Sequence, residues 1–175
     1  MNIYIICIIV LGLIALLALI INGIEDYKTH NISFNESLEL TNMPIVSFKH
    51  GKRKINFLVD TGSDFSYIDE SIVKHLKIKD RDNSGNNILT ANGYMQTSGN
   101  ITIDLSHDGN IVEGEFTVGN IKDAMDSAFA PRIIVRGILG SIFLKRYRYI
   151  IDYNNNELKY KKRKRGYSKI STPKQ

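Results

Sequence analysis

The sequence has very few of the residues that build disulfide frameworks or metal centres. A single cysteine, Cys7, is present among 175 residues, so no disulfide can form within one chain. The four histidines are scattered, and none has the spacing of a metal-ligand motif such as HExxH. They are His30, His50, His75 and His107. We therefore predict no metal site and no cofactor.

Charged residues are missing from the start of the chain. Residues 3–21 carry no charge, and as a helix the run is long enough to cross a ~30 Å hydrocarbon core. A cleaved signal peptide is disfavoured, because no Lys or Arg precedes the run and residues 20–24 form a poor cleavage site. We predict a single-pass transmembrane anchor over residues 1–24, which would place the protein in a membrane. A polar stretch without periodicity follows, and predicts a tether over residues 25–43.

Acidic residues are absent from the C-terminal end, which carries eight Lys and Arg between 159 and 175, whereas the whole chain has a net charge of only +5. We predict a basic, disordered tail over residues 161–175. A second interpretation stays open, since such clusters bind anionic lipid at about 1 kcal/mol per charge. Nucleic-acid binding is disfavoured because no further basic stripe accompanies the tail. Basic residues follow the anchor and none precedes it, which favours a cytoplasmic over an external domain.

The stretch from Ile55 to Ser63 is the strongest candidate for chemistry. An apolar run ends on Asp60, and a strand of this kind buries alternate side chains over 57–59 and exposes the carboxylate where it stops. Gly62 permits a tight turn, and the hydroxyls of Thr61 and Ser63 can hydrogen-bond to the carboxylate or to each other. Asp and Gly also open ordinary loops. The rest of the chain favours a carboxylate that is placed to act on a substrate.

The residues from 44 to 160 predict one mostly-β domain with two short helices and no internal repeat. Apolar content of 43% and charged content of 23% fit a globular core. Expected strands and hairpins cover 44–48, 55–59, 88–96, 101–105, 112–118, 133–135 and 150–160. One helix is expected near 68–76 with Asp69 as its cap, and another beyond Ser141, which can cap it. Asn92-Gly93 between apolar residues is a strong hairpin signal.

The order of these features resembles the retropepsin-like aspartic proteases. The resemblance rests on the strand into Asp60-Thr61-Gly62-Ser63, the Ala91-Asn92-Gly93-Tyr94 hairpin, the segment Gly137-Ile138-Leu139-Gly140 and the closing Ile151-Asp152-Tyr153 hairpin. It covers roughly residues 44–160 and implies an all-β acid protease fold.

The resemblance also implies roles for these residues. Asp60 would be catalytic, Thr61 and Gly62 would shape the turn, and Thr61 would join the two halves of the site. The hairpin of Ala91, Asn92, Gly93 and Tyr94 would be a flap over bound peptide, and Ile138, Leu139 and Gly140 would support the catalytic loop. One departure is Ser141-Ile142, where many relatives carry Asp, Arg or Asn.

Carboxylate chemistry gives a separate reason to expect a dimer. Peptide hydrolysis of this kind needs one ionised carboxyl group to activate water and one protonated group to polarise the carbonyl. The sequence holds one Asp-Thr-Gly, so a two-fold axis would supply the second Asp60. Two hypotheses follow. One is a membrane-anchored, homodimeric aspartic endopeptidase that acts on peptides or proteins; the other is a non-catalytic peptide-binding or dimerisation module of the same fold, tethered to the membrane.

Overall fold

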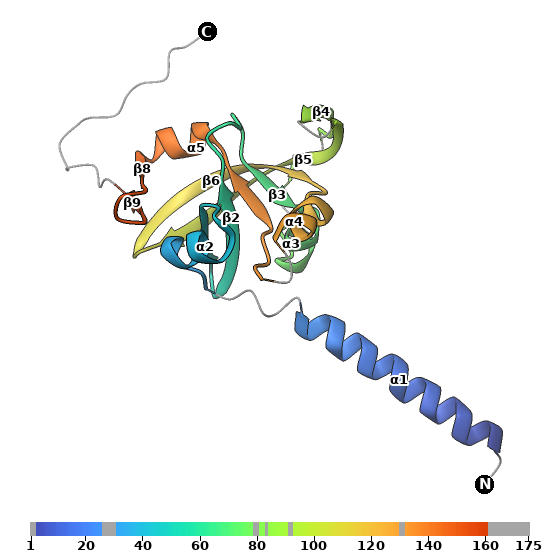
Figure 1. Cartoon of the computed structure of the whole chain (residues 1–175). Coiled ribbons are helices and arrows are strands. Elements are labelled where there is room, and N and C mark those ends of the chain that lie inside the picture. The colour runs from blue at the N-terminus through green and yellow to red at the C-terminus, as the bar shows by residue number, and fades with distance from the viewer. Residues whose placement is uncertain are drawn as a thin grey trace.

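The computed structural model describes residues 3–25, 31–78, 81–82, 84–90, 93–129 and 132–160 (Figure 1). The predicted tail over 161–175 lies outside these residues. The helices are α1 (Ile3–Glu25), α2 (Phe34–Thr41), α3 (Glu70–His75), α4 (Lys122–Phe129) and α5 (Ser141–Arg146). The strands are β1 (Ile45–His50), β2 (Arg53–Val59), β3 (Tyr67–Asp69), β4 (Asn87–Thr90), β5 (Gly93–His107), β6 (Asn110–Gly119), β7 (Gly137–Leu139), β8 (Tyr149–Asp152) and β9 (Glu157–Tyr160).

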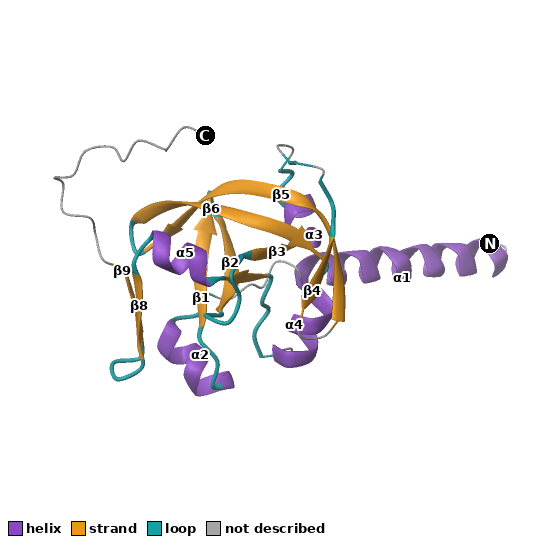
Figure 2. Ribbon diagram, turned by 90° about the horizontal axis from the view of Figure 1, so that it is seen from above, coloured by secondary structure: helices purple, strands orange, loops and turns teal. Residues whose placement is uncertain are grey.

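Seven strands form one curved sheet in the order β1-β2-β7-β3-β6-β5-β4 (Figure 2). A further pairing of Lys49 in β1 with Ser106 in β5 closes the sheet into a barrel. β8 and β9 form a separate two-stranded sheet. The short strand β7 lies between β2, to which it is parallel, and β3, to which it is antiparallel. This mostly-β barrel with short helices confirms the predicted fold class at that level.

The hairpins follow local sequence signals. β1 and β2 are joined by a two-residue loop in which Gly51 has φ +58°. β5 and β6 are joined through Asp108 and Gly109, with φ of +47° and +74°. Asp-Gly is a preferred pair for such a turn, because both residues tolerate positive φ. Both connections therefore depend on residues that tolerate positive φ.

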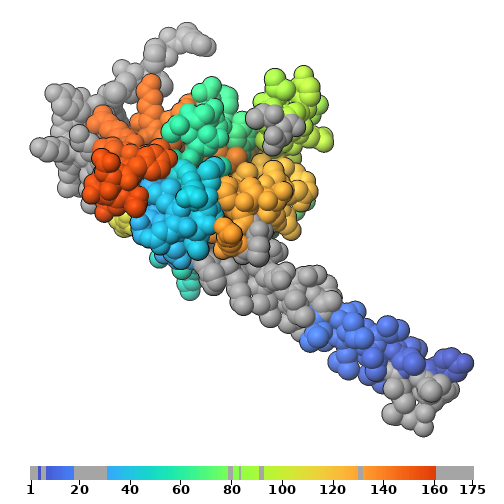
Figure 3. All heavy atoms as spheres, viewed as in Figure 1, coloured from blue at the N-terminus to red at the C-terminus, as the bar shows by residue number. Residues whose placement is uncertain are grey.

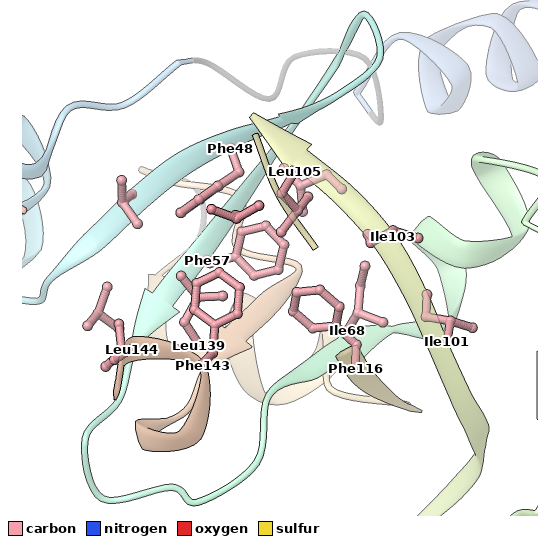
Figure 4. Close-up of a cluster of buried hydrophobic side chains, with 14 of the residues drawn as sticks. Phe48, Phe57, Ile68, Ile101, Ile103, Leu105, Phe116, Leu139, Phe143 and Leu144 are labelled. Atoms are coloured by element: carbon pink, nitrogen blue, oxygen red, sulfur yellow. The ribbon is translucent and has the colours of Figure 1, made fainter. Parts of the chain in front are cut away.

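Aromatic side chains fill the centre of the barrel (Figure 4). Phe57 stacks on Phe116 with ring centroids 5.3 Å apart and meets Phe48 edge to face at 5.7 Å. Such pairs contribute ~0.5–1.5 kcal/mol each beyond their buried area. Phe143 of α5 packs against the same cluster and thereby fixes α5 on the barrel.

β2 is buried on both faces, which differs from the predicted alternation. Phe57 and Val59 face the barrel core, whereas Leu58 packs into a second cluster with Ile133 and Val135. The prediction was wrong for Leu58, because the segment before β7 covers the outer face of the strand. Residues 133–135 form no strand, although they are apolar; the strand begins at Gly137.

The structure contains more short helices than the two that were predicted. α3 is present with Asp69 as its N-cap, as expected. At α5 the N-cap is Gly140 and makes no side-chain hydrogen bond, so the predicted cap at Ser141 is wrong. α4 and α2 were not predicted; each has eight residues, too few to show a clear apolar period.

The predicted tether is partly folded onto the domain. Ser33 caps α2 in a capping box with Glu36, and Phe34 is buried in the main cluster. The Ile32 amide donates to Ser47 Oγ at 2.8 Å and the Ile45 amide to Ser37 Oγ at 3.0 Å. The domain therefore begins near residue 31 rather than 44, because polar side chains anchor a segment that carries little apolar pattern.

α1 lies apart from the barrel in Figure 1. Its side chains are described only for Tyr4 and residues 7–17. Among the described residues, no helix is found that combines the length and hydropathy needed to cross a membrane.

Candidate active site

Asp60 stands where β2 stops and is held there by backbone hydrogen bonds. Its amide donates to the Leu139 carbonyl at 3.0 Å, which continues the β2–β7 pairing by one residue. The Gly62 amide donates to Asp60 Oδ1 at 2.9 Å, and the Ser63 amide donates to the Asp60 carbonyl at 3.3 Å. The side chain is half-buried. A short turn thus fixes the carboxylate and leaves part of it open.

The hydroxyls of this turn do not serve the carboxylate as predicted. Ser63 Oγ donates to the Phe65 carbonyl at 2.9 Å, and Thr61 is exposed. The backbone amide of Gly62 takes the place expected for a hydroxyl. A Cβ built on Gly62 would lie 3.2 Å from Asp60 Oδ1, so glycine gives the carboxylate room at this point.

The predicted supporting segment does lie against the turn. Ile138 and Leu139 belong to β7, which pairs with β2 directly before Asp60. Beyond the strand, the Ser141 amide donates to the Ser63 carbonyl at 2.7 Å. The structure therefore brings the turn that begins at Asp60 into contact with the segment 138–140, although almost 80 positions separate the two in the sequence.

Two further residues of the site were not predicted. Ser66 is buried, and its Oγ accepts the Gly140 amide at 3.0 Å, which ties the far side of the turn to β7. Burial raises the pKa of the Tyr67 phenol, while a hydrogen bond with Ser63 opposes this effect. A polar residue beside a short strand carries no distinctive sequence signal, because its partner is far away in the chain.

The hairpin of β4 and β5 extends from the same end of the barrel as the loop between β2 and β3 (Figure 1). Thr90 pairs with Gly93, which has φ +107°. The predicted flap residues Ala91 and Asn92 lie outside the described residues. Tyr94 is 80% exposed. Among the described residues, no hydrogen bond joins this hairpin to the Asp60 turn. Its role as a flap stays a prediction.

The other nearby carboxylates have structural partners. Asp64 Oδ1 accepts Ser141 Oγ at 3.5 Å. Asp69 is buried and accepts the amides of Ser71, Ile121 and Lys122 at 2.9, 3.0 and 2.7 Å, so it joins the starts of α3 and α4. Asp60 is therefore the carboxylate that the described fold presents at an apolar strand end without a neighbouring cation.

The barrel is closed, and β2 ends on the turn that holds the Asp60 carboxylate. The short strand β7, which begins with Gly137 and is followed by Gly140, supports this turn. Together these features define a retropepsin-like aspartic protease fold. The aspartyl protease family model matches residues 46–143, and the chain belongs to this family.

Three solved structures are similar to the chain, and the first of them shows the same fold. The retroviral protease-like domain of Ddi1 from Leishmania major has a TM-score of 0.54 at 18% identity, with 67% of this chain and 87% of that chain covered. EIAV protease in complex with the inhibitor HBY-793 has a TM-score of 0.46 at 21% identity, over 59% and 86% of the two chains. A retropepsin-like aspartic protease from Rickettsia conorii has a TM-score of 0.44 at 22% identity, over 62% and 82%. No curated protein matches the chain.

Proposed function

We propose that the protein is an aspartic endopeptidase that hydrolyses peptide bonds with Asp60 as its catalytic residue. The observation that carries this proposal is the carboxylate of Asp60 at the end of β2, which backbone hydrogen bonds hold in place and which is only half-buried. Membership of the aspartyl protease family supports the same conclusion. A module that only bound peptide would have no need of a carboxylate held in this way.

The chemistry requires a second carboxyl group, which we propose comes from Asp60 of a second copy. Two carboxyl groups a few Å apart share a proton, because both cannot be ionised together. The ionised group activates water, and the protonated group polarises the scissile carbonyl. Asp64 and Asp69, the nearest acids in sequence, are engaged elsewhere.

We also propose that α1 anchors the enzyme in a membrane, with the barrel on the cytoplasmic side. The helix has 23 residues, which is ~35 Å at 1.5 Å per residue. Its large apolar side chains are 47–74% exposed where they are described, and they occupy consecutive positions around the helix. A helix that is apolar on every side needs an apolar environment. The basic residues that follow the anchor support the orientation.

Asp60→Asn tests the catalytic assignment. The change keeps the size of the side chain and an oxygen for the Gly62 amide, but removes the acid. We expect hydrolysis of casein or a peptide library to fall at least ~100-fold in the full-length protein in detergent micelles, with circular dichroism unchanged. Asp64→Asn, four residues away, is the matched control and should keep most of the activity.

The same preparation distinguishes the non-catalytic alternative. Wild-type protein that binds peptides but does not cleave them, with affinity unaffected by Asp60→Asn, would assign the fold to a binding module. Turnover above a few per cent in purified Asp60→Asn would refute the role of Asp60.

A further inference from the structure

The β1–β2 hairpin carries the densest run of positive charge in the described part of the chain. Lys49, Lys52, Arg53 and Lys54 fall within six consecutive residues that contain no acid. All four side chains are exposed. We call residues 49–54 the basic hairpin. Its tip is the two-residue loop of Gly51 and Lys52.

Three lysines of the basic hairpin have no ion-pair partner in the described part of the chain, and two of them lie opposite each other. Among the described residues, no ion pair is found for Lys49, Lys52 or Lys54, although Lys74 and Lys159 elsewhere are paired. The strand register places Lys49 directly opposite Lys54. Like charges at opposed positions of an antiparallel pair repel each other and destabilise it. An external surface of negative charge would relieve this repulsion.

The fold places the basic hairpin close to the point where the chain from α1 reaches the barrel. The Ile32 amide donates to Ser47 Oγ at 2.8 Å, and Lys49 lies only two residues further along β1. α1 ends at Glu25, and six peptide units up to Asn31 span at most ~20 Å. Whatever surface holds α1 is therefore within reach of the basic hairpin.

The candidate active site lies at the other end of β2. The strand starts at Arg53 in the basic hairpin and runs directly into Asp60, a length of ~23 Å at ~3.3 Å per residue. In Figure 3 the hairpin tip projects from the lower edge of the barrel, whereas Figure 1 shows the loop between β2 and β3 at the upper end. The charged surface and the candidate active site thus lie at opposite ends of β2.

We propose that the basic hairpin docks on the anionic headgroups of the bilayer that holds α1, an inference that rests on the proposed membrane anchor. Docking orients the barrel so that β2 points away from the bilayer. The Asp60 turn and the β4–β5 hairpin then open toward the aqueous phase. The occupant of this surface is an anionic lipid headgroup layer, and phosphatidylserine vesicles serve as its probe.

Energy transfer to a headgroup dye tests the proposal with the full-length protein in vesicles. Cys7→Ser removes the one native thiol, and donor dyes are placed at Ser106→Cys, beside Lys49, or at Phe65→Cys, beyond the Asp60 turn. We expect transfer from position 106 to rise when phosphatidylserine is added to phosphatidylcholine, and to fall again at about 1 M NaCl, where the Debye length is ~3 Å. Transfer from position 65 should stay lower.

Two triple variants show whether the basic hairpin is responsible. Lys49→Gln/Lys52→Gln/Lys54→Gln should lower the ratio of docked to undocked protein on the order of 100-fold, since each charge near an anionic surface contributes about fivefold. The matched control Lys74→Gln/Lys122→Gln/Lys145→Gln removes three exposed lysines elsewhere and should leave docking unchanged. Equal effects of the two triple variants, or no response to phosphatidylserine, would overturn the proposal.

Different measurements test the anchor and the docking surface. Flotation with vesicles of phosphatidylcholine alone reports on the anchor, because those vesicles carry no net charge. Failure to float with these vesicles would contradict the anchor. The docking proposal would then still require that the wild-type protein binds phosphatidylserine vesicles, that the hairpin triple variant loses this binding and that the control keeps it. Hairpin-dependent binding to single-stranded RNA that is tighter than binding to these vesicles would assign the surface to nucleic acid instead.

Discussion

Gly140 is packed against the backbone of Phe65, and no larger residue fits at this position. A Cβ built on Gly140 would lie 2.6 Å from the Phe65 carbonyl carbon and 2.8 Å from the Asp64 carbonyl oxygen. The contact joins the end of β7 to the turn that follows Asp60. It explains in physical terms why a segment ending in glycine stands behind the candidate active site.

Gly140→Ala should therefore disturb the site as well as the fold. The clash is with backbone, which cannot rotate away, so the turn or β7 must shift. We expect unfolding to become easier by about 1–3 kcal/mol in urea titrations, with a larger proportional loss of peptidase activity. Gly12→Ala is the control, because a Cβ there meets nothing within 4 Å. Wild-type stability and activity in Gly140→Ala would contradict the packing described here.

Mixing wild-type and Asp60→Asn chains tests the shared site. Random pairing at equal amounts gives a quarter wild-type, half mixed and a quarter mutant dimers. Mixed dimers hold a single carboxylate and should be inactive. Activity per wild-type chain should fall to about half, provided that subunits exchange and the concentration stays well above the dissociation constant. No loss after verified exchange would remove the two-copy model.

The buried ion pair of Arg136 and Asp126 should matter more for stability than the exposed pair of Arg146 and Glu115. Arg136 contacts both carboxylate oxygens at 2.6 and 3.2 Å and is 7% exposed, whereas Arg146 is 43% exposed at a similar distance. Arg136→Met should cost roughly 3 kcal/mol, because it leaves a partly buried carboxylate unpaired. Arg146→Met should cost less than about 1 kcal/mol. Urea unfolding of both variants makes the comparison, and equal costs would contradict it.

His107 should make the fold less stable at mildly acidic pH. Its ring stacks on Phe48 at 4.7 Å, and Nδ1 has no hydrogen-bond partner within the described structure. Burial lowers the pKa of His107 and outweighs the Asp108 carboxylate, which raises it. The unfolded chain thus binds a proton more readily, so stability is lost as pH falls from about 6.5 through the lower folded-state pKa.

Replacing His107 isolates this contribution. His107→Phe keeps an aromatic ring against Phe48 and removes the titrating group. The difference in unfolding free energy between pH 7.5 and pH 5 should be smaller in this variant than in the wild-type protein. His50→Phe, at the exposed hairpin, serves as the comparison. An unchanged pH difference in His107→Phe would show that His107 does not carry the effect.

Local signals in the sequence determined the parts of the fold in which neighbours in the chain are neighbours in space. The apolar run into Asp60, the Asp69 cap of α3 and the Asp108–Gly109 turn all depend on contacts within a few residues. Strand period, side-chain capping and positive φ act at that range, so the residues themselves predict them.

Tertiary structure alone decided how the candidate site is supported. Three features of the site join segments that are far apart in the sequence. They are the insertion of β7 beside β2, the hydrogen bond from the Gly140 amide to Ser66 Oγ, and the burial of Leu58 by Ile133 and Val135. Parallel pairing and buried side-chain hydrogen bonds leave no periodic pattern in either partner. α2 was not predicted for the same reason, because Ser37 and Phe34 fix it to parts of the barrel that are distant in the sequence. The carboxylate could be named from the sequence, whereas the groups that hold it in place became visible only once the chain was folded.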